Sequence, residues 1–119
     1  MENVYKIILQ KIVAIIKDKK GLDIVALDVS EFSSITDCIL IAQGNVERHV
    51  RAIANAIKKE MKLLGLSPYK TEGVQAGEWA VLDYRYVIVH LFKPDQRSRY
   101  RLEDLWSQGK EIDLERSSA

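Results

Sequence analysis

Residues 72–92 read EGVQAGEWAVLDYRYVIVHLF and contain two β-rich runs, 79–83 and 86–92, separated by Tyr84 and Arg85. A connection this short predicts two adjacent antiparallel strands. Successive side chains of a strand point to opposite faces, so the second run should bury one face and leave an unusually apolar face on the other side. The expected core face is Val87, Val89 and Leu91, and the other face is Tyr86, Ile88, His90 and Phe92.

The first of these runs begins with a tryptophan, Trp79, that follows a loop containing Gly73 and Gly77. The two glycines allow the backbone to bend sharply there, and Trp79 shares a strand face with Val81 and Asp83. We therefore expect Trp79 to be more exposed than a core tryptophan and to form part of a binding surface. The alternative is an internal packing role, because tryptophan is usually largely buried.

Composition favours one compact domain. The chain has 119 residues, of which 47% are hydrophobic and 29% are charged, which suits a folded domain at 1–107 followed by a polar tail at 108–119. Its 18 basic and 17 acidic residues give a net charge of +1. Because this total lacks the strongly basic footprint of a phosphate-backbone binder, we expect no direct sequence-specific nucleic-acid binding.

The chain contains a single cysteine, no cleavable hydrophobic leader and no run of about 18 apolar residues. These features predict a cytoplasmic protein without an internal disulfide and without a membrane partner.

Hydrophobic periodicity and turn residues predict the remaining elements. Helices are expected at 4–20, 45–64 and 95–109, and further strands at 23–29, 38–42 and 69–73. The last of these strands should lie at an edge of the sheet, while 23–29 should be covered on both faces and pair antiparallel with 38–42. The fold class is therefore α+β (mixed α/β), with a mixed sheet of about five strands packed by helices and no signal that sets the strand order.

Several finer expectations concern the helices. Ile7 is assigned to the apolar stripe of the first helix, and Asn45 and Asp95 are assigned as caps of the second and third. Trp106 is assigned to the core. The lysines at 17–20 are interpreted as a solvated helix terminus, where the negative end of the helix dipole favours cations.

No group of residues in the sequence has the composition and spacing that catalysis or metal binding requires. Cys38 lies within an apolar run, where a buried thiol is the ordinary outcome, and His49 and His90 lack partners at metal-ligand spacing. Asp23 and Asp28 are five residues apart, which places their carboxylates on opposite faces of a regular strand. No phosphate-binding glycine motif is present. We expect no catalytic residue, metal or cofactor.

The ordered set of residues resembles the ribosomal silencing factor family, also called Iojap-like or RsfS. The resemblance covers about 5–107 and is loose at 93–99 and after Ser107. It rests on DIVALDV at 23–29, SSITD at 33–37, RHV at 48–50, Glu72-Gly73, Trp79, Asp83, VIVH at 87–90, Arg97, Tyr100 and LEDLW at 102–106.

The resemblance implies a fold similar to that of nucleotidyltransferases without the catalytic site. It also implies a factor that binds the large ribosomal subunit through its ribosomal protein fourteen and obstructs joining of the small subunit when nutrients are scarce. We expect six residues to form the partner-binding surface: Glu78, Trp79, Asp83, Tyr86, Ile88 and His90.

Two alternatives from other classes remain open. One is a nucleotidyltransferase-like enzyme, which nucleotide and divalent-metal binding would reveal. The other is a scaffold dimer with no ribosomal role. The face that holds Ile88 and Phe92, together with Trp79, is expected to be exposed and apolar enough to self-associate, which predicts a homodimer when the ribosomal partner is absent.

Overall fold

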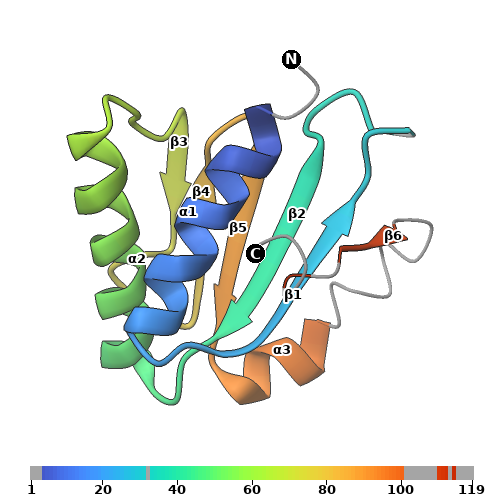
Figure 1. Ribbon diagram of the computed structural model, residues 1–119. Helices are drawn as coiled ribbons and strands as arrows, with labels where there is room; N and C mark the ends of the chain where they lie inside the picture. The colour runs from blue at the N-terminus through green and yellow to red at the C-terminus, as the bar shows by residue number, and fades with distance from the viewer. Residues whose placement is uncertain (1–3, 32, 101–109, 113, 115–119) are drawn as a thin grey trace.

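The computed structural model describes residues 4–31, 33–100, 110–112 and 114. The described strands form one mixed sheet, and helices α1 and α2 lie side by side across one of its faces (Figure 1). The strand order is β3-β4-β5-β2-β1-β6. In chain order the elements are α1 (Val4–Asp18), β1 (Leu22–Asp28), β2 (Cys38–Gln43), α2 (Glu47–Leu63), β3 (Lys70–Glu72), β4 (Trp79–Asp83), β5 (Val87–Phe92), α3 (Pro94–Tyr100) and β6 (Lys110–Glu111). The predicted α+β class is confirmed, with one strand more than expected.

The observed strand pairing confirms the two predicted antiparallel pairs and the predicted edge strand. It also includes a parallel pair that the sequence did not indicate. β1 pairs antiparallel with β2, β4 pairs antiparallel with β5, and β3 is an edge strand. The two antiparallel groups are joined by parallel pairing of β2 with β5, in a register that runs from Cys38 opposite Val87 to Gln43 opposite Phe92. This contact places β5 and β2 at the centre of the sheet.

The expectation that β1 is covered on both faces is wrong for its first half. Leu22 is 40% exposed, Asp23 is exposed and has a φ of 50°, and the register with β2 shifts between Leu22 and Val25. The strand is flanked by β2 and by the two-residue β6, and β6 pairs only with its far end, Leu27 and Asp28. The beginning of β1 therefore lies open to solvent.

The sixth strand comes from the segment that the sequence placed in a polar tail. Leu27 pairs with Glu111 and Asp28 with Lys110, and the Ile112 N–H donates to the Ala26 carbonyl over 2.8 Å. Ile112 and Leu114 pack against the main core. A two-residue strand has too little alternation to be predicted from its pattern, so the expected number of five strands was too low.

The main core lies between the sheet and the two long helices. α1 contributes Ile8, Leu9, Ile12, Val13, Ile15 and Ile16. Ile7 is 65% exposed, so its assignment to this stripe is wrong. At 100° per residue, Ile7 points roughly 160° away from the centre of the buried face of α1. The helix therefore cannot bury Ile7 and that face against the same core.

A second apolar cluster occupies the other face of the sheet. Phe92 has an exposed fraction of 0%, which contradicts the expectation that it lies on an exposed face. Alternation along the strand is kept, but both faces of the central strands are buried, as is usual where parallel pairing is present. The buried members are Leu27, Val29, Ile39, Ile41 and Phe92, with Val25, Trp79 and Ile88 packed against them.

Both predicted helix caps are wrong. α2 has Val46 as its N-cap without a side-chain hydrogen bond, and the Asn45 backbone N–H donates to His49 Nδ1. α3 begins at Pro94, which needs no N–H at the first helical position, so Asp95 lies in the first turn. The rest of the predicted 95–109 helix, including Trp106, lies outside the described residues.

Candidate functional site

The six predicted partner-binding residues lie on or beside the β4–β5 hairpin. Trp79, Asp83, Ile88 and His90 share the sheet face opposite the one that α1 and α2 cover, and all four are half-buried. Tyr86 is 47% exposed in the turn, and Glu78 is exposed just before β4. The six residues thus line the length of the β4–β5 hairpin, with Glu78 and Trp79 at one end and Asp83 and Tyr86 at the turn, and the ring of Trp79 is the largest group.

Trp79 is held by two aromatic neighbours on the adjacent strand. Its ring stacks on Phe92 with 4.9 Å between centroids, and His90 lies 6.0 Å from Trp79 and 6.2 Å from Phe92. The Trp79 Nε1–H donates to His90 Nδ1 over 3.0 Å. Sequence reasoning missed Phe92 as the supporting ring, although the hairpin register places it directly opposite Trp79.

His90 is neutral in this arrangement. Burial lowers the pKa of His90 from 6.5 to about 4, because the charged imidazolium loses its hydration. Accepting the Trp79 N–H also requires a lone pair on Nδ1, so the remaining proton is on Nε2. The centre of the surface is therefore an uncharged aromatic group with a single orientation.

Asp83 has a structural task in the hairpin turn. Its Oδ1 accepts the Arg85 backbone N–H over 2.7 Å, and Arg85 has a φ of 71°. The Arg85 guanidinium carbon lies 3.9 Å from the centroid of the Tyr69 ring, a cation–π contact to the segment before β3. A substitution at Asp83 would therefore disturb the turn as well as any partner contact.

The glycine loop before Trp79 is packed tightly against α2. The Gly77 N–H donates to the Gly73 carbonyl over 3.1 Å, and a Cβ at Gly77 would lie 2.6 Å from the Glu47 carbonyl oxygen. Gly77 also has a φ of 73°, which L side chains rarely adopt. Only glycine fits this close contact between the loop and the backbone of α2. The contact fixes the position of the loop immediately before β4.

A second link secures the same end of the hairpin. Lys93 donates its backbone N–H to the Glu78 carbonyl over 3.1 Å and its ammonium to Glu47 Oε2 over 2.8 Å. This hydrogen bond lowers the pKa of Glu47 and raises that of Lys93. The beginning of β4, the end of β5 and the beginning of α2 are thus joined around Trp79.

The residues considered for catalysis have structural roles. Cys38 is fully buried, and its pKa is raised to about 12 by burial and by the nearby Asp28, so the unreactive thiol form is kept. His49 accepts the Asn45 N–H at Nδ1 and donates from Nε2 to the Lys19 carbonyl over 2.7 Å. Across the described part of the chain, no three His, Cys, Asp or Glu residues gather to hold a metal ion. Within the same residues no helix is long and apolar enough to span a membrane.

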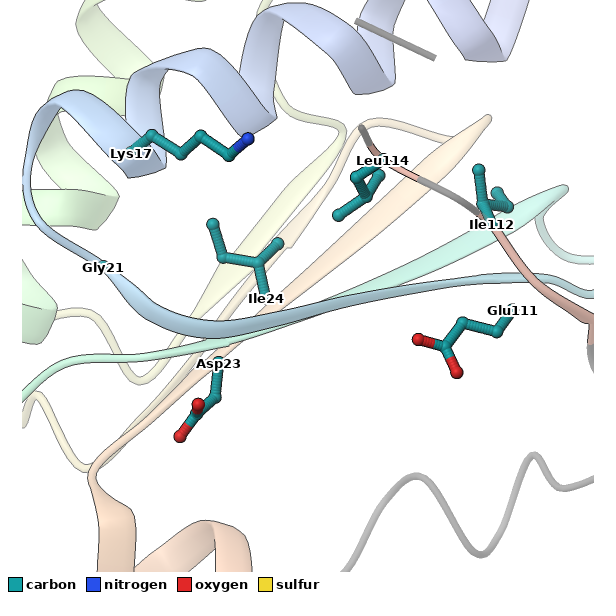
Figure 2. Close-up of a pocket in the computed structure, with 7 residues that line it drawn as sticks. All are labelled: Lys17, Gly21, Asp23, Ile24, Glu111, Ile112 and Leu114. Atoms are coloured by element: carbon teal, nitrogen blue, oxygen red, sulfur yellow. The ribbon is translucent and has the colours of Figure 1, made fainter. Parts of the chain in front are cut away.

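A hollow of about 620 Å³ lies away from the hairpin, between the end of α1, β1 and β6. Figure 2 shows Ile24 and Leu114 between α1 and β1, whereas the carboxylates of Asp23 and Glu111 lie on the other side of β1. None of the six predicted residues lines this hollow. Its charged groups do not converge, so it does not form a catalytic cluster.

Comparison with known proteins decides the family. The sequence model described as "Ribosomal silencing factor during starvation" matches residues 3–119. The chain belongs to the ribosomal silencing factor family. The resemblance found from the sequence motifs is confirmed, and the family is one of regulators of translation with a ribosome-related silencing role.

Individual relatives agree with this assignment. The chain is 39% identical over 110 residues to the ribosomal silencing factor RsfS of Bacillus subtilis, covering 92% of this chain and 93% of that one. A crystal structure of a protein from Chromobacterium violaceum has a TM-score of 0.82 and 33% identity, covering 89% and 88%. A mouse relative named mitochondrial assembly of ribosomal large subunit protein 1 is 31% identical over 99 residues, covering 81% of this chain and 43% of that one.

Proposed function

We propose that this protein binds the large ribosomal subunit through its ribosomal protein fourteen and thereby blocks joining of the small subunit when nutrients are scarce. The observation that carries the proposal is membership of a family described as silencing ribosomes during starvation. The name of the mouse relative, which refers to the large subunit, supports the choice of subunit. We place the protein in the cytoplasm, where the ribosomes of its bacterial relatives work.

The β4–β5 face is the proposed contact with the ribosomal protein. Binding energy at interfaces concentrates in a few aromatic and arginine side chains that are already ordered before binding. Trp79 fits this requirement because stacking on Phe92 and the hydrogen bond to His90 hold its ring in place. Exposed Tyr86 and Glu78 supply polar groups at the rim of the same surface.

Steric inhibition of subunit joining requires only that the docked factor occupies space at the subunit interface. The chain has a radius of gyration of 13.0 Å and extents of 35 × 33 × 27 Å. A body of this size at the subunit interface obstructs the approach of the other subunit without any chemical step. Inhibition is therefore stoichiometric with large subunits, independent of nucleotide, and reversed by excess free ribosomal protein fourteen.

A subunit-joining assay tests the proposal. The factor is titrated into purified large subunits before small subunits are added, and joined ribosomes are separated by sedimentation. Full inhibition is expected near one factor per large subunit. Full inhibition at far lower amounts would indicate turnover and refute the steric mechanism, and failure to sediment with large subunits would refute the attachment.

Charge reversal at Glu78 tests the surface itself. The Glu78→Lys variant should slow association with the ribosomal protein, because an acidic rim complements basic ribosomal side chains. Glu111→Lys is the matched control, since Glu111 is exposed on β6, four strands or about 19 Å across the sheet from β4. Equal slowing by both variants would mean that only net charge matters. Asp83 is avoided because it holds the hairpin turn.

A further inference from the structure

The near-neutral total charge conceals a strong separation of charge within the fold. Segments 4–20 and 47–63, which hold α1 and α2, contain ten of the 18 basic residues but only three of the 17 acidic ones. Their formal charge is +7, so the rest of the chain carries −6. Because both helices cover the same face of the sheet, the positive charge is concentrated on one side of the molecule (Figure 1).

Within this layer the basic residues of α2 form a single stripe. At 100° per residue all five fall within an arc of about 100°, which extends for roughly 21 Å along the helix. Arg48, Lys59 and Lys62 are exposed, and Arg51 and Lys58 are half-buried. We call this set the basic stripe: Arg48, Arg51, Lys58, Lys59 and Lys62.

The acidic residues of α2 do not neutralise the stripe. Glu47 is paired with Lys93, and Glu60 lines the groove between α1 and α2, outside the stripe. Among the described residues, Arg48, Lys58, Lys59 and Lys62 form no ion pair. Their charge is therefore available to a partner.

Tertiary contacts extend and shape the positive surface. The hydrogen bond from His49 to the Lys19 carbonyl joins the beginning of α2 to the segment that follows α1, where Lys19 and Lys20 are exposed. On the other flank a hollow of about 500 Å³ lies between the helix and the loop at 71–76. Its helical wall is Arg51, Asn55 and Lys58, and Arg51 Nη1 is ordered by donating to the Gln75 carbonyl over 3.1 Å.

We propose that the basic stripe of α2 binds the phosphate backbone of RNA without reading its sequence. A row of five cations, four of them without an ion pair to any described residue, suits a repeating chain of phosphates, which binds through release of counterions. The stripe contains no large apolar side chain, whereas helices that bind membrane surfaces place such groups beside their cations. Leu63, which is 79% exposed, lines the groove toward α1 instead.

This inference goes beyond the proposed contact with a ribosomal protein, because the stripe and the Trp79 surface lie on opposite faces of the sheet. The ribosome supplies both a protein and RNA, so the two faces can be occupied together. RNA and the ribosomal protein therefore bind the factor simultaneously and do not compete.

The test is fluorescence anisotropy of the protein with a short labelled RNA hairpin over a range of KCl concentrations. With about five phosphate contacts, the slope of log affinity against log salt is about −4.5, taking roughly the 0.9 per contact of a duplex. The variant Lys58→Gln/Lys59→Gln/Lys62→Gln should reduce the slope to about −1.8. Lysine and glutamine have similar helix propensities, so the fold is retained, and circular dichroism checks this.

The matched control, Lys6→Gln/Lys11→Gln/Lys110→Gln, removes the same charge outside the stripe and should leave the slope near that of the unmodified protein. Equal losses in both variants, or no binding to the hairpin at 50 mM KCl, would overturn the inference. Equal affinity for vesicles rich in phosphatidylserine or for polyglutamate would also overturn it. Because no ribosome is present, each result is independent of the subunit-joining assay.

Discussion

Replacing His90 by glutamine should remove most of the pH dependence of stability that this histidine imposes between pH 7.5 and pH 5.0. Burial lowers the pKa of folded His90 to about 4, whereas the unfolded chain titrates near 6.5. Between these values the unfolded chain binds more protons than the folded one. Stability from this residue is therefore fully present above pH 6.5 and is lost as the pH falls from 6.5 toward 4.

The size of the effect follows from the two pKa values. A shift of one pKa unit corresponds to about 1.4 kcal/mol, so the full difference is about 3.5 kcal/mol, of which about 2 kcal/mol has been lost at pH 5.0. At about 4 °C per kcal/mol for a chain of this size, the melting temperature falls by roughly 8 °C. Glu47 does not interfere, because its lowered pKa places its own loss of stability below pH 4.5.

Urea denaturation at the two pH values measures the difference for both proteins. Glutamine cannot titrate in this range, and its side-chain oxygen can still accept the Trp79 N–H. Comparing the pH-induced change in the unmodified protein with that in His90→Gln cancels every other titrating group. If both proteins lose the same stability to within about 0.5 kcal/mol, the burial and neutrality assigned to His90 are wrong.

Three further predictions follow from the packing of the hairpin. Trp79→Phe keeps an aromatic ring on the second cluster but removes the donor to His90, so chemical denaturation should show a loss of about 1 kcal/mol; an unchanged free energy of unfolding would contradict the hydrogen bond. Gly77→Ala should cost about 3 kcal/mol because it adds a clash to an unfavourable φ, whereas Gly65→Ala, with nothing within 4 Å, should cost only about 1 kcal/mol. Equal thermal shifts for the two variants would refute the close approach. Phe92 is buried, so self-association of the free factor should use the half-buried Trp79 and Ile88 that remain on this face, and light scattering that gives a monomer mass at every concentration would exclude this contact.

Features that depend on neighbours in the chain could be predicted from the sequence. Alternation assigned Val87, Val89 and Leu91 to the main core, and the short connections predicted antiparallel pairing of β1 with β2 and of β4 with β5. Burial of Cys38 followed from the apolar run around it. These predictions hold because strand period and loop length act over a few residues.

Features that depend on distant segments could not be predicted. Parallel pairing of β2 with β5 joins strands separated by a helix and two further strands, and no local pattern states which edges meet. That pairing and the second cluster bury Phe92 beneath Trp79, so a residue expected on an open face became the support of the proposed site. The capping prediction for Asn45 failed because α2 takes Val46 as its N-cap, while the Asn45 N–H donates to His49, whose other ring nitrogen donates to the Lys19 carbonyl just after α1.

The charge of the protein shows most directly which properties follow from the sequence and which require the tertiary structure. The sequence alone determined the net charge of +1, the family and the alternation that places Trp79 beside its partner strand. Only the tertiary structure decided that the +7 of segments 4–20 and 47–63 gathers on the side of the sheet that α1 and α2 cover. Net charge is a sum that carries no positions, whereas the field that a partner meets depends on which side chains the fold places together.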